Sequence, residues 1–189
     1  MNSIMQIART WAMPNGNTFS ITPIRNLVRD CCREAGYESV IVDPFANSSK
    51  YGTITNDLNP EFDTDFHLDA LEFLRTRADE EADLVLYDPP YSITQASQLY
   101  KSYGRDKLET SVSNMAYWAQ CKDEIARITK YGGCVICCGW NSNGIGRERW
   151  FTMEQMLIVA HGGSKNDTIV TVERKTKKKQ LELFAEVEQ

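Results

Sequence analysis

Short apolar segments that resemble strands alternate along this chain with segments that resemble amphipathic helices, and this alternation constrains the fold most. Residues 22–36 carry apolar side chains at helical spacing, with Thr22 as the predicted N-cap and Gly36 at the predicted end. Such alternation is typical of a parallel sheet with helices on both faces. The other predicted elements are strands at 39–43, 52–57, 83–88 and 131–140, and helices at 69–80 and 114–130.

The end of the chain has a different pattern. Residues 155–175 contain two apolar runs joined by a polar, glycine-rich turn, which indicates an antiparallel hairpin. The predicted fold is therefore an α/β, Rossmann-like domain with a mostly parallel sheet and a C-terminal antiparallel hairpin.

Acidic residues end three of the predicted strands, at Asp43, Asp57 and Asp88. In parallel sheets the carboxyl ends of the strands lie at one edge, and ligands bind there. We therefore expect these three carboxylates along one edge. Asp57, at the end of the second strand, is well placed to accept hydrogen bonds from both ribose hydroxyls of a nucleoside cofactor, although a capping or solvated role is the alternative.

The stretch VLYDPPYS, residues 85–92, ends an apolar strand with a carboxylate, a rigid turn and a tyrosine. Asp88 and the Pro89 carbonyl form a pair of acceptors, which suits the two donors of an exocyclic amino group. Pro89 and Pro90 fix the geometry in advance, and Tyr91 offers a flat face on which a base stacks. A simple turn is the alternative interpretation.

This DPPY stretch resembles the catalytic motif of the amino-group DNA methyltransferases, chiefly the small phage or bacterial enzymes of the N6-adenine type. TFSITPI (18–24), VDPFANSS (42–49), TND, DALEFL and HGGSKNDTIVTVE resemble further motifs of that family, so the resemblance extends over most of residues 18–174. It implies a seven-stranded sheet, S-adenosylmethionine as cofactor, and catalysis at Asp88, Pro89, Pro90 and Tyr91. The cofactor site implied by the resemblance consists of Phe19, Thr22, Asp43, Pro44, Phe45, Asp57, Leu58, Asp69 and Ala70.

One loop departs from the family pattern. The family has Gly-Ser-Gly after the DPFA stretch, whereas this chain has Asn47, Ser48 and Ser49. Asparagine adopts the left-handed backbone conformation more readily than most residues, so Asn47 is an acceptable substitute for glycine. Ser49 is harder to reconcile with a glycine position. This departure favours the alternative that the chain is a non-catalytic, methyltransferase-like binding module.

DNA contact is expected in the longest predicted loop, residues 92–114. Aromatic and basic side chains are interleaved there, a pattern that suits phosphate contact and base stacking. A solvated lid over the active site is the alternative. The residues expected to contact DNA are Tyr100, Lys101, Arg105 and Lys107.

A short peptide near the C-terminus resembles the Q-L-x-L-F motif by which bacterial replication proteins dock on the sliding clamp. Leu183 and Phe184 would enter an apolar pocket, while Gln180 would hydrogen-bond at its rim and Leu181 completes the motif. The resemblance divides the chain into a methyltransferase domain, 1–174, and a flexible basic tail, 175–189. An amphipathic turn packed on the domain is the alternative.

Composition limits the remaining possibilities. The net charge of −5 excludes a general basic attraction to nucleic acid, so any DNA contact must be local. Cys134 and Cys137 have CxxC spacing, but they lie in a predicted strand, where they would point to opposite faces, so no metal site is expected. Six cysteines without a disulfide pattern favour a reducing cytoplasm, bacterial or phage-infected. The predicted activity is methylation of adenine N6 in DNA, with N4-cytosine or RNA amino groups as alternative targets.

Overall fold

The computed structural model describes residues 5–104 and 114–176. Its strands are β1 (Gln6–Trp11), β2 (Ile41–Asp43), β3 (Ile54–Thr55), β4 (Ala82–Tyr87), β5 (Thr129–Gly139), β6 (Phe151–Ala160) and β7 (Thr168–Lys175). They form one seven-stranded sheet in the order β1-β6-β7-β5-β4-β2-β3. β7 runs antiparallel to β5 and β6, whereas the other neighbouring strands are parallel. The predicted α/β fold with a mostly parallel sheet is confirmed.

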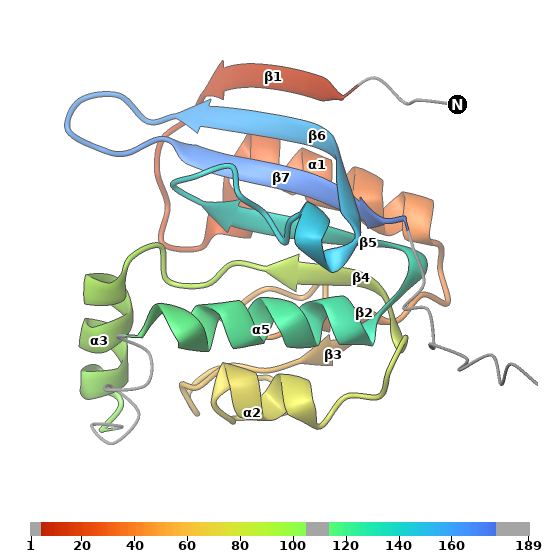
Figure 1. Cartoon of the computed structure of the whole chain (residues 1–189). Coiled ribbons are helices and arrows are strands. Elements are labelled where there is room, and N and C mark those ends of the chain that lie inside the picture. Colours follow the sequence, from red (N-terminus) through yellow and green to blue (C-terminus); the bar gives the residue numbers. More distant parts are fainter. Residues whose placement is uncertain (1–4, 105–113, 177–189) are drawn as a thin grey trace, which may run out of the picture.

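Helices cover both faces of the sheet (Figure 1). α1 (Thr22–Ala35) lies behind it, while α2 (Ala70–Arg75) and α5 (Met115–Ile128) lie in front. Two apolar cores result, because alternate residues of each strand face opposite sides. On β5, for example, Ile136 packs in the core under α1, whereas Val135 packs in the core under α2 and α5. Cys134 and Cys137 likewise belong to different cores, as their strand position predicts.

α1 follows from its sequence with one difference. Its buried residues Ile24, Leu27 and Val28 have the predicted helical spacing. The helix ends at Gly36, whose φ of 101° disfavours residues with a side chain. Thr22 is the first helical residue and not the N-cap, which is Ile21, without a side-chain cap. Pro23, in the first turn, favours this start without a side-chain cap, because proline has no N–H that would be left unsatisfied there.

Two elements differ from the sequence prediction. The residues of β1 show no alternation of apolar and polar side chains, because all six are exposed at the edge of the sheet. α3 (Ile93–Ser102) occupies the first part of the segment predicted to be a loop, and the Ser92 hydroxyl caps it by accepting a hydrogen bond from the Gln95 N–H. In Figure 1, α3 stands at the carboxyl edge of the sheet, beside the N-terminal end of α5.

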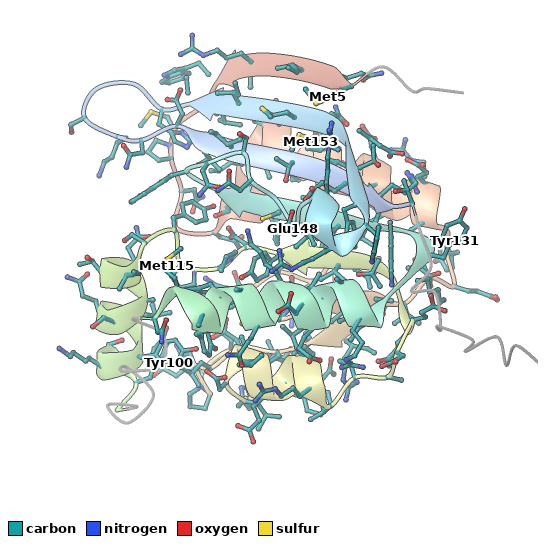
Figure 2. All side chains as sticks on the ribbon, viewed as in Figure 1. Met5, Tyr100, Met115, Tyr131, Glu148 and Met153 are labelled. Carbon is teal, nitrogen blue, oxygen red and sulfur yellow. The ribbon has the colours of Figure 1, made fainter. Side chains whose placement is uncertain are left out.

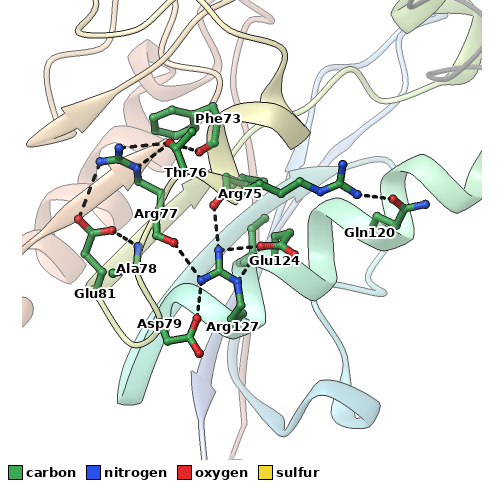
Figure 3. Close-up of polar contacts among 12 residues, drawn as sticks. Phe73, Arg75, Thr76, Arg77, Ala78, Asp79, Glu81, Gln120, Glu124 and Arg127 are labelled. Carbon is green, nitrogen blue, oxygen red and sulfur yellow. Dashed lines mark hydrogen bonds and ion pairs between the residues drawn. The ribbon is translucent and has the colours of Figure 1, made fainter.

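Arg127 fastens α5 to α2 and to the segment after it (Figure 3). Its guanidinium donates to the carbonyl oxygens of Leu74 and Arg77, at 3.1 and 2.9 Å, and forms ion pairs with Asp79 and Glu124. The guanidinium group has five N–H donors in a fixed plane, which suits so many acceptors. This contact holds α2 against α5.

The basic run near the C-terminus is partly used inside the fold. Arg174 forms ion pairs with Glu34 and Glu154, and the buried Lys175 donates to the carbonyl oxygens of Ala126 and Thr129. These two cations are therefore not free to form a surface patch. β7 ends at Lys175, one residue beyond residue 174, where the methyltransferase domain was expected to end. Within residues 5–104 and 114–176, no helix is both long and apolar enough to cross a membrane.

Candidate active site

The three acidic strand ends meet at the carboxyl edge of the sheet, because β3, β2 and β4 are neighbours. Asp43 ends β2, Asp88 directly follows β4, and Asp57 lies two residues beyond β3. The charges of Asp57 and Asp88 both act on Asp43. Beside them lies a cavity of about 600 Å³, a size typical of ligand pockets.

Seven residues predicted from the sequence line this cavity: Phe19, Phe45, Asp57, Asp88, Pro89, Pro90 and Tyr91. Others in the lining were not predicted. The segment Asn15–Thr18 contributes one wall, and Gln98, Leu99 and Tyr103 of the α3 region contribute another. No sequence signal marked α3, because its buried residues are only Ala96 and Tyr100.

Asp57 presents its carboxylate to the cavity in a fixed orientation. Oδ2 accepts a hydrogen bond from the Asn47 N–H at 2.9 Å, and Oδ1 accepts one from the Asn59 N–H at 2.9 Å. Each oxygen keeps acceptor capacity, since a carboxylate has about four lone-pair positions. Burial raises the pKa of Asp57, against the effect of these hydrogen bonds. The side chain is able to accept two further hydrogen bonds from a ligand.

Asp43 lies beneath the cavity and does not line it. Its side chain is fully buried, and burial raises its pKa to about 8. Oδ1 accepts a hydrogen bond from the Phe45 N–H, and hydrogen bonding by Phe45 and Ser49 lowers the pKa of Asp43 against the effect of burial. No described group lies in close hydrogen-bond geometry with Oδ2, so burial favours the neutral form of this carboxyl group.

The loop that departs from the family pattern folds without conflict. Asn47 has a φ of 50°, the left-handed conformation expected for a residue in a glycine position. Ser49 has no positive φ, and its N–H donates to the Ala46 carbonyl at 2.7 Å. Neither substitution therefore distorts the backbone that faces the cavity.

Asp69, predicted to contact the cofactor, has its partners inside the protein. Both oxygens are used inside the protein: Oδ1 caps α2 by accepting from the Leu71 and Glu72 N–H groups, and Oδ2 accepts from the hydroxyls of Tyr100 and Tyr117, each at 2.7 Å. Asp69 does not line the cavity. It is a structural residue that joins three helices.

Tyr100, which was expected to contact DNA, lies on α3 (Figure 2) and its side chain is only 2% exposed. Its hydroxyl donates to Asp69 and lies 3.1 Å from the hydroxyl of Tyr117. Lys101 is exposed on α3, while Arg105 and Lys107 lie outside the described residues. The clamp-like peptide residues Gln180, Leu181, Leu183 and Phe184 also lie outside them.

Four further predicted cofactor residues do not line the cavity. Thr22 is exposed at the start of α1, Pro44 and Ala70 are buried, and Leu58 packs against the core. Pro44 instead supplies a carbonyl that accepts from the Asn56 side chain at 3.1 Å. The resemblance placed these residues by sequence position, which does not determine where each side chain points.

Asp88 is held by two hydroxyl groups. The Tyr91 hydroxyl donates to Oδ1 at 2.7 Å, and the Thr18 hydroxyl lies 3.1 Å from that of Tyr91. Burial raises the pKa of Asp88 to about 6, although hydrogen bonds from Tyr91 and Thr18 lower it. One of the two oxygens of the acceptor predicted for an amino group therefore already accepts a hydrogen bond from Tyr91 in this conformation.

A second cavity, of about 340 Å³, lies on the other side of the Pro89–Tyr91 segment and shares Pro89, Pro90 and Tyr91 with the first. The edge of the Tyr91 ring meets Trp140, with ring centroids 5.8 Å apart. Trp118 and Lys122 of α5 also line this cavity. The sequence analysis missed Trp140, although a tryptophan directly after a buried strand at the ligand-binding edge is a usable signal.

The donors and acceptors of the larger cavity fit S-adenosylmethionine. Asp57 offers acceptors for ribose hydroxyls, and the left-handed backbone of Asn47 leaves room for the cofactor beside it. Asp88 would supply negative charge for a positively charged sulfur. The aromatic rings of Phe45 and Phe19 provide apolar walls. These residues would hold the cofactor between β2, β3 and β4.

No protein-family model and no curated protein matches the chain. Among solved structures it is similar to the 1,6-didemethyltoxoflavin-N1-methyltransferase of Burkholderia thailandensis, with a TM-score of 0.56 and 12% identity over 81% of this chain and 78% of that chain. It is also similar to the N-methyltransferase NodS of Bradyrhizobium japonicum WM9, with a TM-score of 0.54 and 12% identity over 87% and 100% of the two chains.

A third similar structure is NSun6 of Pyrococcus horikoshii, with a TM-score of 0.50 and 11% identity. The match covers 80% of this chain but 52% of NSun6, so the present chain spans about half of that protein. The fold is that of the Rossmann-like methyltransferases. At these identities, the likeness shows the fold alone.

Proposed function

We propose that this protein transfers a methyl group from S-adenosylmethionine to the exocyclic N6 amino group of adenine in DNA. The observation that carries the proposal is the position of Asp88 and Pro89 at the end of a buried strand: both residues line the larger cavity, and Pro89 also lines the smaller one. One cavity has the acidic groups that suit the cofactor, and the other has aromatic walls that suit a flat base.

When bound, S-adenosylmethionine supplies an electrophilic methyl group on a positively charged sulfur. Asp57 would accept hydrogen bonds from the ribose hydroxyls. Phe45 would contact the apolar part of the cofactor, and the Asn15–Thr18 segment would cover its methionine end. The carboxylates around the cavity favour a cationic ligand because opposite charges attract strongly where solvent is partly excluded.

Asp88 and the Pro89 carbonyl would accept hydrogen bonds from the two hydrogens of the target amino group. This arrangement pulls the nitrogen toward tetrahedral geometry and directs its lone pair to the cofactor cavity. The Tyr91 hydroxyl uses one acceptor position of Asp88 Oδ1, and the amino group would use a remaining position of the carboxylate or replace that hydroxyl. The methylated nitrogen then loses its extra proton, which Asp88 is able to receive and release to water.

The DPPY resemblance supports adenine in DNA as the target, and the aromatic pair Tyr91 and Trp140 supports a flat, unstacked base. A small-molecule amine is the second candidate, because two similar structures are named as N-methyltransferases, one of them solved with bound 1,6-didemethyltoxoflavin. Cytosine N4 remains a third possible acceptor with the same donor pattern.

The test is transfer of a labelled methyl group to unmodified DNA, followed by digestion to nucleosides. We expect label in N6-methyldeoxyadenosine, and its loss in Asp88→Ala. Label in N4-methylcytosine would instead identify cytosine as the target base. Absence of label in DNA, with cofactor binding intact by calorimetry, would reject a DNA methyltransferase.

We also propose that the C-terminal peptide recruits the protein to a sliding clamp, which would raise its local concentration on newly made DNA. This proposal rests on the sequence motif alone. The variant Leu183→Ala with Phe184→Ala is expected to abolish binding to a bacterial clamp in surface-immobilised assays. A variant that binds with wild-type affinity would reject the proposal.

A further inference from the structure

The smaller cavity contains a charged group that the proposed chemistry does not use. Of the described residues that line it, Lys122 is the one cation, and the others are mostly aromatic, apolar or amide side chains. The walls include Tyr91, Trp118 and Trp140, and Asn141 and Asn143 lie at the loop after β5. Such a cavity suits a flat heterocycle that is oriented by a few polar groups.

Lys122 is fixed in position but keeps hydrogen-bonding capacity. Its ammonium donates one hydrogen bond to the carbonyl oxygen of Gly144. The carboxylate of Glu173 accepts from the N–H groups of Ile145 and Gly146, so the loop that holds Lys122 is itself held by β7. An ammonium group has three donors, and residues 5–104 and 114–176 form no ion pair with this one.

The position of Lys122 relative to Asp88 matters for a bound base. Pro89, Cys137 and Lys122 line the same cavity, and the charges of both Lys122 and Asp88 act on the Cys137 thiol. A base that fills this cavity with its amino group at Pro89 would therefore have Lys122 within the same enclosure. Adenine has two acceptor ring nitrogens near its amino group: N1 is bonded to the carbon that carries the amino group, and N7 is bonded to the next ring carbon on the other side.

We propose that Lys122 determines specificity by donating a hydrogen bond to a ring nitrogen of the methyl-accepting base. This inference rests on the proposed function, because it assumes that the smaller cavity holds the acceptor. It assigns to α5 a role in recognising the base, and it requires a base with an acceptor nitrogen beside the amino carbon. The rest of the cavity then provides stacking surfaces that are indifferent to sequence.

The test compares wild-type protein with Lys122→Met, which has similar length but no charge. Oligonucleotides carry one target adenine, 1-deazaadenine or 7-deazaadenine, and the readouts are kcat/KM and equilibrium binding by fluorescence anisotropy. We expect the wild type to lose about 10- to 100-fold on the analogue that lacks the recognised nitrogen, as for a hydrogen bond to a charged group. Lys122→Met should lose a similar factor on adenine and treat adenine and that analogue alike.

Lys130→Met is the matched control, because it removes a lysine that forms an ion pair with Asp83 at the opposite edge of the sheet. It should keep the wild-type preference. If Lys122→Met weakens all substrates equally and keeps the wild-type preference, Lys122 only supports the Gly144 loop and the inference is wrong. If the wild type ignores both ring nitrogens, the inference is also wrong.

The binding readout separates this inference from the proposed function. Methyl transfer could fail on every oligonucleotide, which would reject the proposed activity. A binding preference for adenine that disappears in Lys122→Met would still support recognition by Lys122. Conversely, active wild-type enzyme without any preference between the analogues would reject the inference and leave the proposed activity intact.

Discussion

Replacement of Tyr91 by phenylalanine is expected to raise the pKa of Asp88. The Tyr91 hydroxyl donates to Asp88 Oδ1 at 2.7 Å, and this hydrogen bond stabilises the ionised carboxylate. Burial already raises the pKa of Asp88 to about 6. Without the hydroxyl, the ionised form loses a donor while the burial remains, so the proton is bound more tightly.

The size of the change follows from the strength of the lost contact. A hydrogen bond to a charged group contributes about 1.5 to 3 kcal/mol, and 1.36 kcal/mol corresponds to one pH unit, so the pKa should rise by about one to two pH units. Some solvent reaches this half-buried site, and water partly replaces the hydroxyl. The lower end of that range is therefore the better expectation. Thr18→Val should shift the pKa of Asp88 in the same direction, since Thr18 also lowers it.

Two measurements report this pKa. The acid limb of kcat/KM against pH gives it for the free enzyme, because an ionised Asp88 is needed to accept hydrogen bonds from the amino group. A titration of the Asp88 carboxyl carbon by nuclear magnetic resonance, assigned with Asp88→Asn, gives it without any substrate. Tyr37→Phe is the control, because Tyr37 is fully exposed and far from Asp88 in the sequence. An unchanged or lowered pKa in Tyr91→Phe would refute the role given to the hydroxyl.

Three further predictions follow from the other carboxylates. Asp57→Asn should weaken S-adenosylmethionine binding by about 10-fold or more in calorimetry, because a charged acceptor is lost, and it should also lower the melting temperature, because the amide NH2 cannot accept from the backbone N–H that one carboxylate oxygen serves. Tyr100→Phe should lower the free energy of unfolding in urea by about 1 to 3 kcal/mol without changing cofactor affinity, because Asp69 loses a buried donor; weaker cofactor binding at unchanged stability would contradict the structural role. Asp43 keeps its proton up to about pH 8 in the folded state against 3.8 ordinarily, so unfolding free energy should fall as the pH rises between these values. Asp43→Asn should flatten that fall in urea titrations at several pH values, and an equally steep fall would contradict it.

The sequence predicted much of the framework because its pattern is local. Apolar runs that end in an acid identify β2, β3 and β4, and the amphipathic spacing identifies α1 and α5. β1 escaped prediction because all its residues are exposed, so it carries no alternation of apolar and polar side chains. α3 escaped because few of its residues are buried. In both elements tertiary contacts, which a single sequence does not display, select the structure.

The site was predicted less completely, for a different reason. Strand ends determine which residues reach the carboxyl edge, and Asp57, Phe45 and Asp88 line the cavity there. They do not determine which partner each side chain finds. The carboxylate of Asp69, for example, accepts hydrogen bonds from Tyr100 and Tyr117, which lie 31 and 48 residues away in the chain. No motif encodes such a contact.

The hydrogen-bond partners of Asp43, Asp57 and Asp69 differ in kind from those of the proposed catalytic carboxylate, Asp88. Asp57 accepts from two backbone N–H groups, which the chain holds in place, and Asp43 also accepts from one. Asp69 combines backbone donors with two buried tyrosines. Asp88 instead accepts from the side-chain hydroxyl of Tyr91, which the Thr18 hydroxyl contacts in turn, beside an open cavity. A side-chain hydroxyl turns away by rotation about single bonds, whereas a backbone donor leaves only if the chain refolds locally. Asp88 is thus the carboxylate whose hydrogen-bond partners an incoming amino group is able to replace.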